Sequence, residues 1–331
     1  MKTNILIFRT DRIGDLLVTC PAIIAIKKHF EESNITLIAS EKNIDYAKSL
    51  NIFNQIYLFP NSNIFKKIIF LYNLRKNIYD YIFVFDGKER SIISTAFCTS
   101  KNKFAVTKEI KNIYKLFKIN FFIDNENTNL NTIFQNILSK FNVQINEANY
   151  NFLNNKKNNS FSENISSKSF IHLHIDEKWF TNLYINTYTN INPSYDEIID
   201  FVITMSEASD VVITTGIIDI NLVNQLKDKF FEKITDKIFV NKKHKNLIYL
   251  IFKPTFDDIE SLLRKTRILI ACHGAITHAS NSFNVIKIDI LEKSKIGFYK
   301  RFSSYLNNYF PIFRANFDIL KKEICQKVLK P

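Results

Sequence analysis

Short apolar runs rich in β-branched and aromatic residues recur along the first half of the chain. They predict strands at residues 4–8, 35–39, 55–59 and 81–85, with a weaker one near 104–106. Apolar residues within 16–26 recur at three- and four-residue spacing, which predicts a helix, and further helices are expected near 44–50, 64–76 and 132–140. Strands that are apolar along their length and alternate with helices indicate a parallel sheet covered on both faces.

The same alternation restarts after a polar break. Asn, Lys, Ser and Glu dominate residues 151–168, which show no hydrophobic period and are typical of a linker. Beyond the break, strands are predicted at 170–175, 211–215, 247–250, 268–271 and 285–290, and helices at 195–208, 220–230, 256–265 and 276–283. The sequence therefore predicts an α/β protein with an N-terminal domain (1–155), a linker (156–168) and a C-terminal domain (169–331).

Composition and charge restrict the class of protein only loosely. The chain has 331 residues and a formal net charge of +13, and the excess of Lys and Arg is spread over both halves. Such a charge favours anionic partners in general. Because the basic residues are not clustered and no recognition motif occurs, we do not expect nucleic-acid binding.

Cysteine spacing and the N-terminal segment point to a cytoplasmic protein. The four cysteines, Cys20, Cys98, Cys272 and Cys325, are too far apart for a CxxC metal or redox motif. The first residues carry charges at Arg9, Asp11 and Arg12 and are not expected to form a signal peptide. The apolar run 67–74 is too short to span a membrane. A cytoplasmic protein is expected, and peripheral contact with the inner membrane stays open.

The loop after the first predicted strand contains a candidate catalytic acid. Its candidate residues are Arg9, Thr10, Arg12, Gly14 and Asp15. Asp15 has two interpretations: a general base that takes the proton of an attacking sugar hydroxyl, or a helix cap. The absence of a GxGxxG pattern argues against a nicotinamide enzyme.

Two later strand-to-helix loops combine glycine with polar side chains. One offers His273, Gly274, Thr277 and His278, which can surround a diphosphate with imidazoles, a hydroxyl and helix N-terminal amides. The alternative is a plain turn capped by its histidines. The other loop, Thr215-Gly216, also fits a nucleotide-facing turn, although this pattern is common in α/β proteins.

The strand 170–175 carries two histidines and leads to a lysine. His172 and His174 lie on one face, because strand side chains alternate. They offer no clear third ligand, so we expect no metal site and favour packed histidines. Lys178 lies just beyond the strand end, where an ammonium group can bind phosphate.

Taken together, these loops resemble glycosyltransferase family 9, the heptosyltransferases of lipopolysaccharide core synthesis. The opening ILIFRTDRIGDLLVTCPAIIAIKKHF is similar to the family's first strand, loop and helix, including Arg12-x-Gly14-Asp15 and the following Thr-x-Pro-Ala. Later landmarks occur in the family's order: Lys178 near Trp179, Thr215-Gly216, the helix and strand within 257–271, and Gly274 with His278.

The resemblance implies a GT-B fold, in which two Rossmann-like domains face a cleft. It also implies inverting, metal-independent hexosyl or heptosyl transfer that needs no cofactor. The N-terminal domain would bind a glycolipid or oligosaccharide acceptor, and the C-terminal domain a nucleotide sugar, with an ADP-sugar expected. Asp15 falls on the family's proposed catalytic base. Lys178 falls near its donor-phosphate lysine, although the spacing to Trp179 is one residue tighter than usual.

One loop departs from the family pattern. The family usually has Asp-Ser-Gly or Asp-Thr-Gly near the donor, with a histidine three residues after the glycine. Here the loop is Cys272-His273-Gly274, and His278 is four residues on. The carboxylate expected near the donor sugar is therefore missing and an imidazole is present instead, which puts ADP-heptose in doubt as the donor but leaves nucleotide-sugar binding in place.

Two other functions use the same features. A nucleotide-sugar epimerase or hydrolase would need a similar fold, and a basic nucleic-acid-binding protein would fit the charge alone. The stretch 65–81, FKKIIFLYNLRKNIYDY, either lies on an anionic membrane or forms a core helix with solvated lysines. The core helix is slightly favoured.

Overall fold

Two compact units make up the computed structural model of the chain. The structure describes residues 2–61, 63–125 and 128–329. Unit 1 comprises Met1–Lys156 together with Lys300–Tyr305, and unit 2 comprises Lys157–Tyr299 and Leu306–Pro331. Unit 1 is therefore built from two separate parts of the sequence.

A six-stranded parallel sheet forms the centre of unit 1, in the order β3-β2-β1-β4-β5-β6. The strands are β1 (Asn4–Phe8), β2 (Asn34–Ala39), β3 (Gln55–Leu58), β4 (Tyr81–Val84), β5 (Asn102–Thr107) and β6 (Asn120–Ile123). Ile7 of β1 pairs with Leu37 on one side and Phe83 on the other. The central strand is apolar along its length because both of its faces are covered.

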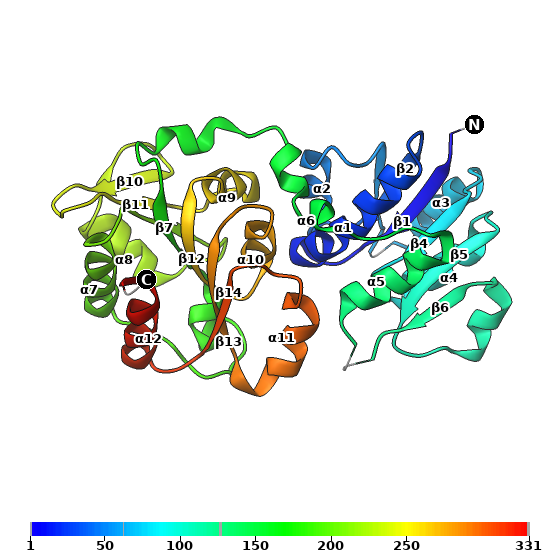
Figure 1. The fold of residues 1–331 in the computed structure, drawn as a ribbon. Coiled ribbons are helices and arrows are strands. Elements are labelled where there is room, and N and C mark those ends of the chain that lie inside the picture. The colour runs from blue at the N-terminus through cyan, green and yellow to red at the C-terminus, as the bar shows by residue number, and fades with distance from the viewer. Residues whose placement is uncertain (1, 62, 126–127, 330–331) are drawn as a thin grey trace. The chain divides into compact units, whose positions relative to one another are not determined.

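Helices cover both faces of this sheet (Figure 1). One layer holds α1 (Ile13–His29), α2 (Ile44–Ser49), α5 (Leu130–Leu138) and α6 (Glu147–Tyr150). The other holds α3 (Ile64–Arg75), α4 (Glu89–Ser94) and the short helices η1 (Thr95–Phe97) and η2 (Asn112–Phe117). Asp15 in the first turn of α1 and Lys27, Lys28 and His29 in its last turn complement the helix dipole.

Unit 2 repeats this strand order around a second sheet, β14-β13-β12-β7-β8-β11-β10-β9. Its strands are β7 (Phe170–Ile175), β8 (Val211–Thr215), β9 (Glu232–Lys233), β10 (Ile238–Asn241), β11 (Ile248–Ile251), β12 (Thr266–Cys272), β13 (Ile286–Leu291) and β14 (Tyr309–Phe313). Strands β9 and β10 add an antiparallel hairpin at one edge. In both units the first strand is central, with the next two parallel strands on one side and the last three on the other. This doubly wound order confirms the predicted α/β class with two Rossmann-like sheets.

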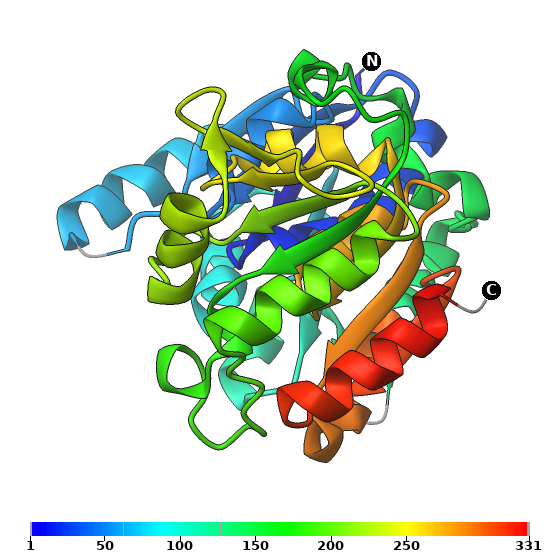
Figure 2. The ribbon, with the colours of Figure 1, turned by 90° about the vertical axis from the view of Figure 1, so that its left-hand side faces the viewer.

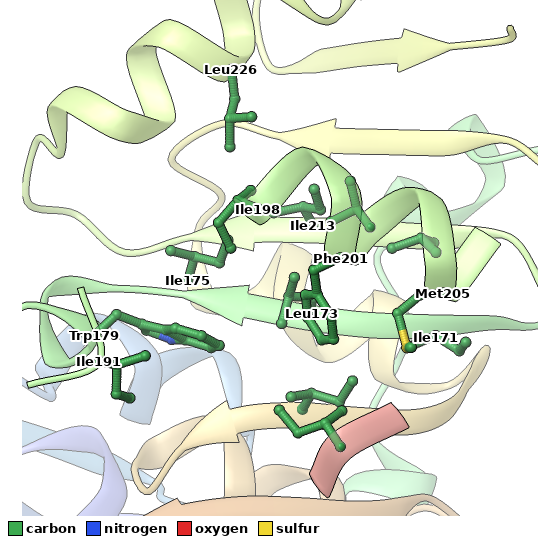
Figure 3. Packing of buried hydrophobic residues seen from close by; sticks show 14 of the residues in the cluster. Ile171, Leu173, Ile175, Trp179, Ile191, Ile198, Phe201, Met205, Ile213 and Leu226 are labelled. Carbon is green, nitrogen blue, oxygen red and sulfur yellow. The ribbon is translucent and has the colours of Figure 1, made fainter. Parts of the chain in front are cut away.

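The helices of unit 2 pack through one large apolar cluster and a smaller one. Helices α7 (Tyr195–Ser206), α8 (Asn221–Lys229) and α12 (Phe317–Leu329) contribute to the larger cluster, whereas α9 (Phe256–Leu263) contributes to the smaller. Figure 3 shows Trp179 in the larger cluster, beside Ile191. The Trp179 indole donates to the carbonyl oxygen of His174 at 2.9 Å, which satisfies its buried N–H. Helices α10 (Ala275–Ser280) and α11 (Ile296–Ser303) follow β12 and β13.

Most of the predicted elements are present with small shifts at their ends, but several were not predicted. These are α4, α6, β6, the β9–β10 hairpin, α11, β14, α12 and the short 3₁₀ helices. Strands β6 and β14 are edge strands with exposed positions. Pro311 within β14 is compatible with an edge position, because an edge strand tolerates a missing N–H.

The polar segment predicted as a linker packs on unit 2. It forms the short helix η5 (Ser160–Asn164), followed by the buried Ile165. The backbone N–H of Ser162 donates to Ser261 Oγ at 3.0 Å, and Ser261 Oγ donates to the carbonyl oxygen of Asn159 at 2.8 Å. Polar contacts with α9 and the packing of Ile165 in the smaller apolar cluster hold this segment.

Candidate functional site

The buried Arg9 side chain holds the loop between β1 and α1. Its Nη1 donates to the carbonyl oxygen of Phe85 at 2.6 Å while Nε donates to that of Asp15 at 3.0 Å. Nη1 is 3.2 Å from the Asp11 carboxylate, and Nη2 is 3.8 Å from that of Asp15. A buried guanidinium needs several such partners. Arg9 therefore fixes the shape of the loop.

Thr10 ties the same loop to the end of β4. Its N–H and hydroxyl donate to Asp86 Oδ2 at 3.2 and 2.7 Å, and Ser91 donates to the same oxygen at 2.7 Å. Burial raises the pKa of Asp86, while the hydrogen bonds from Ser91 and Thr10 counteract this rise. Asp86 was not among the predicted site residues. The Asp-Gly pair at a strand end was the available signal.

A pocket of about 390 Å³ lies beside this loop in unit 1. Its lining comes from the ends of β1, β2 and β4 and from the loop before α3: Thr10, Asp11, Arg12, Asp15, Ser40, Glu41, Lys42, Asn61, Lys88 and Arg90. Ligands of doubly wound sheets bind at this carboxyl edge. Charged groups of both signs suit a polar ligand rich in hydroxyl groups. Gly14 lies in the first turn of α1 and is not a pocket residue.

Asp15 caps a helix and also lines the pocket. Its Oδ2 accepts a hydrogen bond from the Arg12 N–H at 3.2 Å, so it caps the start of α1. The side chain is nevertheless 35% exposed and lines the pocket. A capping carboxylate keeps unused lone pairs and can still accept a proton.

In unit 2, Lys178 pairs with a buried carboxylate. Its Nζ lies 2.6 Å from Asp176 Oδ2, and its N–H donates to Asp176 Oδ1 at 3.1 Å. Burial opposes the charged form of each group. For Asp176, Lys178 and His174 together outweigh burial and hold the pKa of the carboxyl well below its usual range, and Asp176 in turn raises the pKa of Lys178. The pair is therefore ionised at neutral pH.

Three loops of unit 2 meet around this ion pair. A Cβ added at Gly274 would lie 2.7 Å from Lys178 Nζ, and one added at Gly216 would lie 3.0 Å from Asp176 Cβ. The loops after β7, β8 and β12 thus approach within van der Waals contact, so Lys178, Gly216 and Gly274 come together. The hydroxyl oxygen of Thr215 instead accepts a hydrogen bond from the Lys253 N–H at 2.8 Å.

The loop after β12 is held by Asp289 on β13. His273 Nδ1 lies 2.6 Å from Asp289 Oδ2, and Tyr309 donates to the same oxygen at 2.7 Å. Thr277 is buried and donates to Asp289 Oδ1 at 3.0 Å. His278 is also buried, and its ring packs edge-on against that of His273. Asp289 was not among the predicted site residues, although an acid within the apolar strand 286–291 was a visible signal.

The two histidines of β7 form a packed cluster around Thr214. His172 Nε2 and His174 Nδ1 each lie 2.8 Å from Thr214 Oγ1. Burial lowers the pKa of His172 to about 3, and His174 adds to this effect. Within residues 2–61, 63–125 and 128–329, no group of three or more His, Cys, Asp and Glu side chains is arranged to hold a metal ion.

We expect acid to destabilise unit 2 through His172 and His278. Burial holds both folded pKa values below the ordinary value near 6.5, so the unfolded chain binds protons that the fold excludes. Stability falls as the pH drops below 6.5, by about 1.4 kcal/mol per pH unit for each histidine. Urea denaturation at pH 7 and 5.5, followed by the fluorescence of Trp179, the only tryptophan, measures this slope. His172→Asn should remove half of it, and an unchanged slope would contradict the assignment.

Comparison with known proteins identifies the fold through structure alone. No family model and no curated protein matches the sequence. The E. coli heptosyltransferase WaaC, solved with ADP, has a TM-score of 0.68 at 10% identity, over 97% of this chain and 99% of its own. The glycosyl transferase family 9 protein of Veillonella parvula has a TM-score of 0.64 at 11% identity, over 99% and 89%.

Epimerases share the fold less closely. The UDP-GlcNAc 2-epimerase of Methanocaldococcus jannaschii has a TM-score of 0.55 at 12% identity, over 100% of this chain and 93% of its own. At such identities the likeness concerns the fold. It confirms the GT-B class and the resemblance of the fold to family 9 heptosyltransferases.

Proposed function

We propose that the chain is an inverting, metal-independent glycosyltransferase that uses a nucleotide sugar, with an ADP-sugar as the expected donor. The observation that carries the proposal is the position of Asp15. It occupies the Arg-x-Gly-Asp segment and lines a polar pocket at the carboxyl edge of its sheet, in a fold similar to that of heptosyltransferases. The acceptor would be a lipopolysaccharide core or another surface glycan, bound as a glycolipid or oligosaccharide by unit 1.

The proposed reaction is a single displacement at the anomeric carbon. An acceptor hydroxyl oxygen forms a bond to that carbon from the face opposite the leaving group, which inverts its configuration. The bond from the anomeric carbon to the diphosphate oxygen breaks, and both of its electrons leave with the nucleoside diphosphate. The proton of the hydroxyl passes to the Asp15 carboxylate.

Unit 2 would hold the diphosphate of the donor. Lys178 supplies an ammonium group beside Gly274, and the amides of Ala275 and Ile276 at the start of α10 would add further donors. Donors placed where negative charge grows stabilise the departing diphosphate. Cys272 falls on the carboxylate that family 9 usually carries, and the neighbouring His273, held by Asp289, would supply an imidazole instead. Thr277, Thr215 and His278 are buried, so they would position the diphosphate-binding groups and not contact the diphosphate directly.

A nucleotide-sugar screen tests the proposal, and the variant Gly274→Ala tests whether the donor binds beside Lys178. We expect an ADP-sugar to raise the melting temperature, and the sugar to appear on a glycolipid acceptor as ADP is released. The added Cβ of Gly274→Ala displaces only the flexible end of Lys178, so the fold should persist while donor binding weakens about tenfold. Gly297→Ala is the matched control, because its Cβ would meet no atom within 4 Å. If no ADP-, GDP-, UDP- or CDP-sugar binds, the proposal fails.

A second candidate is a nucleotide-sugar epimerase or hydrolase, which the similarity to the archaeal epimerase favours. Product analysis with a labelled donor separates the three reactions. A transferase moves the label to the acceptor, an epimerase leaves it on the nucleotide, and a hydrolase releases it as free sugar.

The proposed place of action is the cytoplasmic face of the inner membrane, by peripheral contact. No helix among the described residues is both long and apolar enough to cross a bilayer.

A further inference from the structure

The exposed apolar side chains of unit 1 are distributed unevenly. Among the described residues of unit 1, the large apolar side chains that are exposed belong to the α3/α4/η1/η2 layer, to the edge strands β3 and β6 and to the connecting turns. The layer of α1, α2, α5 and α6 exposes none among its described residues. Solvent-facing apolar groups are common when scattered, but a concentration on one side marks an interaction surface.

Helix α3 supplies most of this surface. Phe65, Ile68, Ile69 and Tyr72 are spaced as one helical face, and all four are exposed, Phe65 by 72%. The opposite face holds the helix on unit 1 through the buried Leu74 and through Phe70, which packs against Phe59. The preferred interpretation of this stretch as a core helix is therefore wrong. The apolar residues that predicted this helix lie on a face that no other described element covers. Figure 2 shows α3, in light blue, at the margin of unit 1.

Helix η2 belongs to the same layer. Tyr114 anchors it in the apolar cluster that also contains Leu74 of α3, so the two elements cover the same face of the sheet. Ile113 and Leu116 point outward, and Leu116 is 78% exposed. Residues three apart align on a 3₁₀ helix, which makes these two side chains neighbours.

Basic residues surround these apolar groups. On and next to α3 they are Lys66, Lys67, Arg75 and Lys76, and around η2 they are Lys108, Lys111, Lys115 and Lys118. The sequence of α3 contains no acid. Glu89 on α4 is paired with Lys111 at 2.9 Å, which leaves Glu109 as the main opposing charge near η2. The layer therefore presents apolar side chains within a positive field.

We propose that the outer surface of α3 and η2 docks on an anionic membrane. Aromatic and branched apolar side chains would enter the headgroup region while the flanking ammonium and guanidinium groups contact lipid phosphates. A second copy of the chain fits less well, because the same patch on both partners would bring like charges together. The inference builds on the membrane contact in the proposed function, but it concerns binding to lipid and not transfer.

A second pocket connects this surface to the candidate site. It measures about 370 Å³ and is lined by Leu58, Pro60, Asn63, Lys66, Ile69, Phe70 and Asn73, together with Glu41 and Asn61. Glu41 and Asn61 also line the Asp15 pocket. The two pockets therefore adjoin, so an acceptor anchored in the bilayer could reach Asp15 along unit 1 without leaving the membrane surface.

Co-sedimentation of the full chain with vesicles tests the proposal, in the absence of donor and acceptor. We expect binding to phosphatidylcholine vesicles that contain phosphatidylglycerol, weaker binding at high salt, and little binding to phosphatidylcholine alone. Replacing Phe65, Ile68 and Tyr72 together by Ser should weaken binding at least tenfold. Reversing Lys66, Arg75 and Lys76 to Glu should weaken it by about a hundredfold.

The matched control reverses Lys28, Lys48 and Lys140 to Glu, which changes the net charge equally on the opposite layer of unit 1. This variant should lose less than threefold. The proposal is overturned if the control loses as much as the α3 variants, or if the wild type binds both kinds of vesicle equally. It is also overturned if the Ser variant abolishes a dimer seen by sedimentation velocity while vesicle binding stays unchanged. Because no sugar is supplied, an absence of transfer activity would not affect this result.

Discussion

Asp15→Asn is expected to lower the rate of sugar transfer by about a thousandfold while leaving nucleotide-sugar affinity unchanged. The amide oxygen can still accept the hydrogen bond from the Arg12 N–H, so the start of α1 keeps its cap. An amide cannot take the proton of the acceptor hydroxyl at neutral pH, so only the chemical step is impaired. Rates with a labelled nucleotide sugar, and affinities from the melting-temperature shift, separate the two effects.

The control for this prediction is Asp45→Asn. Asp45 is also in the first turn of a helix, is exposed, and lies outside the pocket. It should keep full activity. If Asp15→Asn retains more than a tenth of the wild-type rate, Asp15 is a cap and not the base.

The largest effect on stability is expected from Asp176→Asn. The change leaves the Lys178 ammonium in a mostly enclosed site without its counter-charge, which typically costs about 3–5 kcal/mol. The depressed pKa of Asp176 adds stability above about pH 4, and the raised pKa of Lys178 adds it below about pH 10. The loss should therefore be greatest near neutrality, as measured by urea denaturation with circular dichroism.

The double variant Asp176→Leu/Lys178→Met provides the control. It removes both charges, and replacing a buried ion pair by apolar residues is often nearly neutral for stability. The double variant should recover most of the lost stability but not the affinity for nucleotide sugars. A double variant as unstable as Asp176→Asn would mean that packing at this position, and not the unpaired charge, determines the loss.

The sequence predicted both sheets because their strands recur as short, mostly apolar runs that alternate with helices. β1 and β7 are buried on both faces, whereas a strand at the surface exposes one of its faces. The rule that ligands bind at the carboxyl ends of parallel strands also placed Lys178, Gly216 and Gly274 at one edge of a sheet, where the structure brings them together.

The sequence could not predict which partner each polar side chain would take. Thr277 was expected to face a diphosphate, yet it donates to Asp289 on the next strand. Asp86 and Thr10 are 76 residues apart and share a hydrogen bond only because β1 and β4 are neighbours. The periodicity of α3 identified an apolar face but could not tell whether another element covers it. Strand order and side-chain direction decide these contacts, and neither is visible in spacing.

The division of unit 1 into two sequence segments has a consequence for how the protein is made. Arg301 pairs with Asp124, and the rings of Tyr305 and Tyr150 stack with centroids 5.0 Å apart. A ribosome releases these last pieces of unit 1 only after nearly all of unit 2 has been synthesised. During synthesis, residues 1–156 therefore lack the contacts of residues 300–305 until those residues have been made. A gene fragment that ends at Lys156 would encode a unit without these contacts.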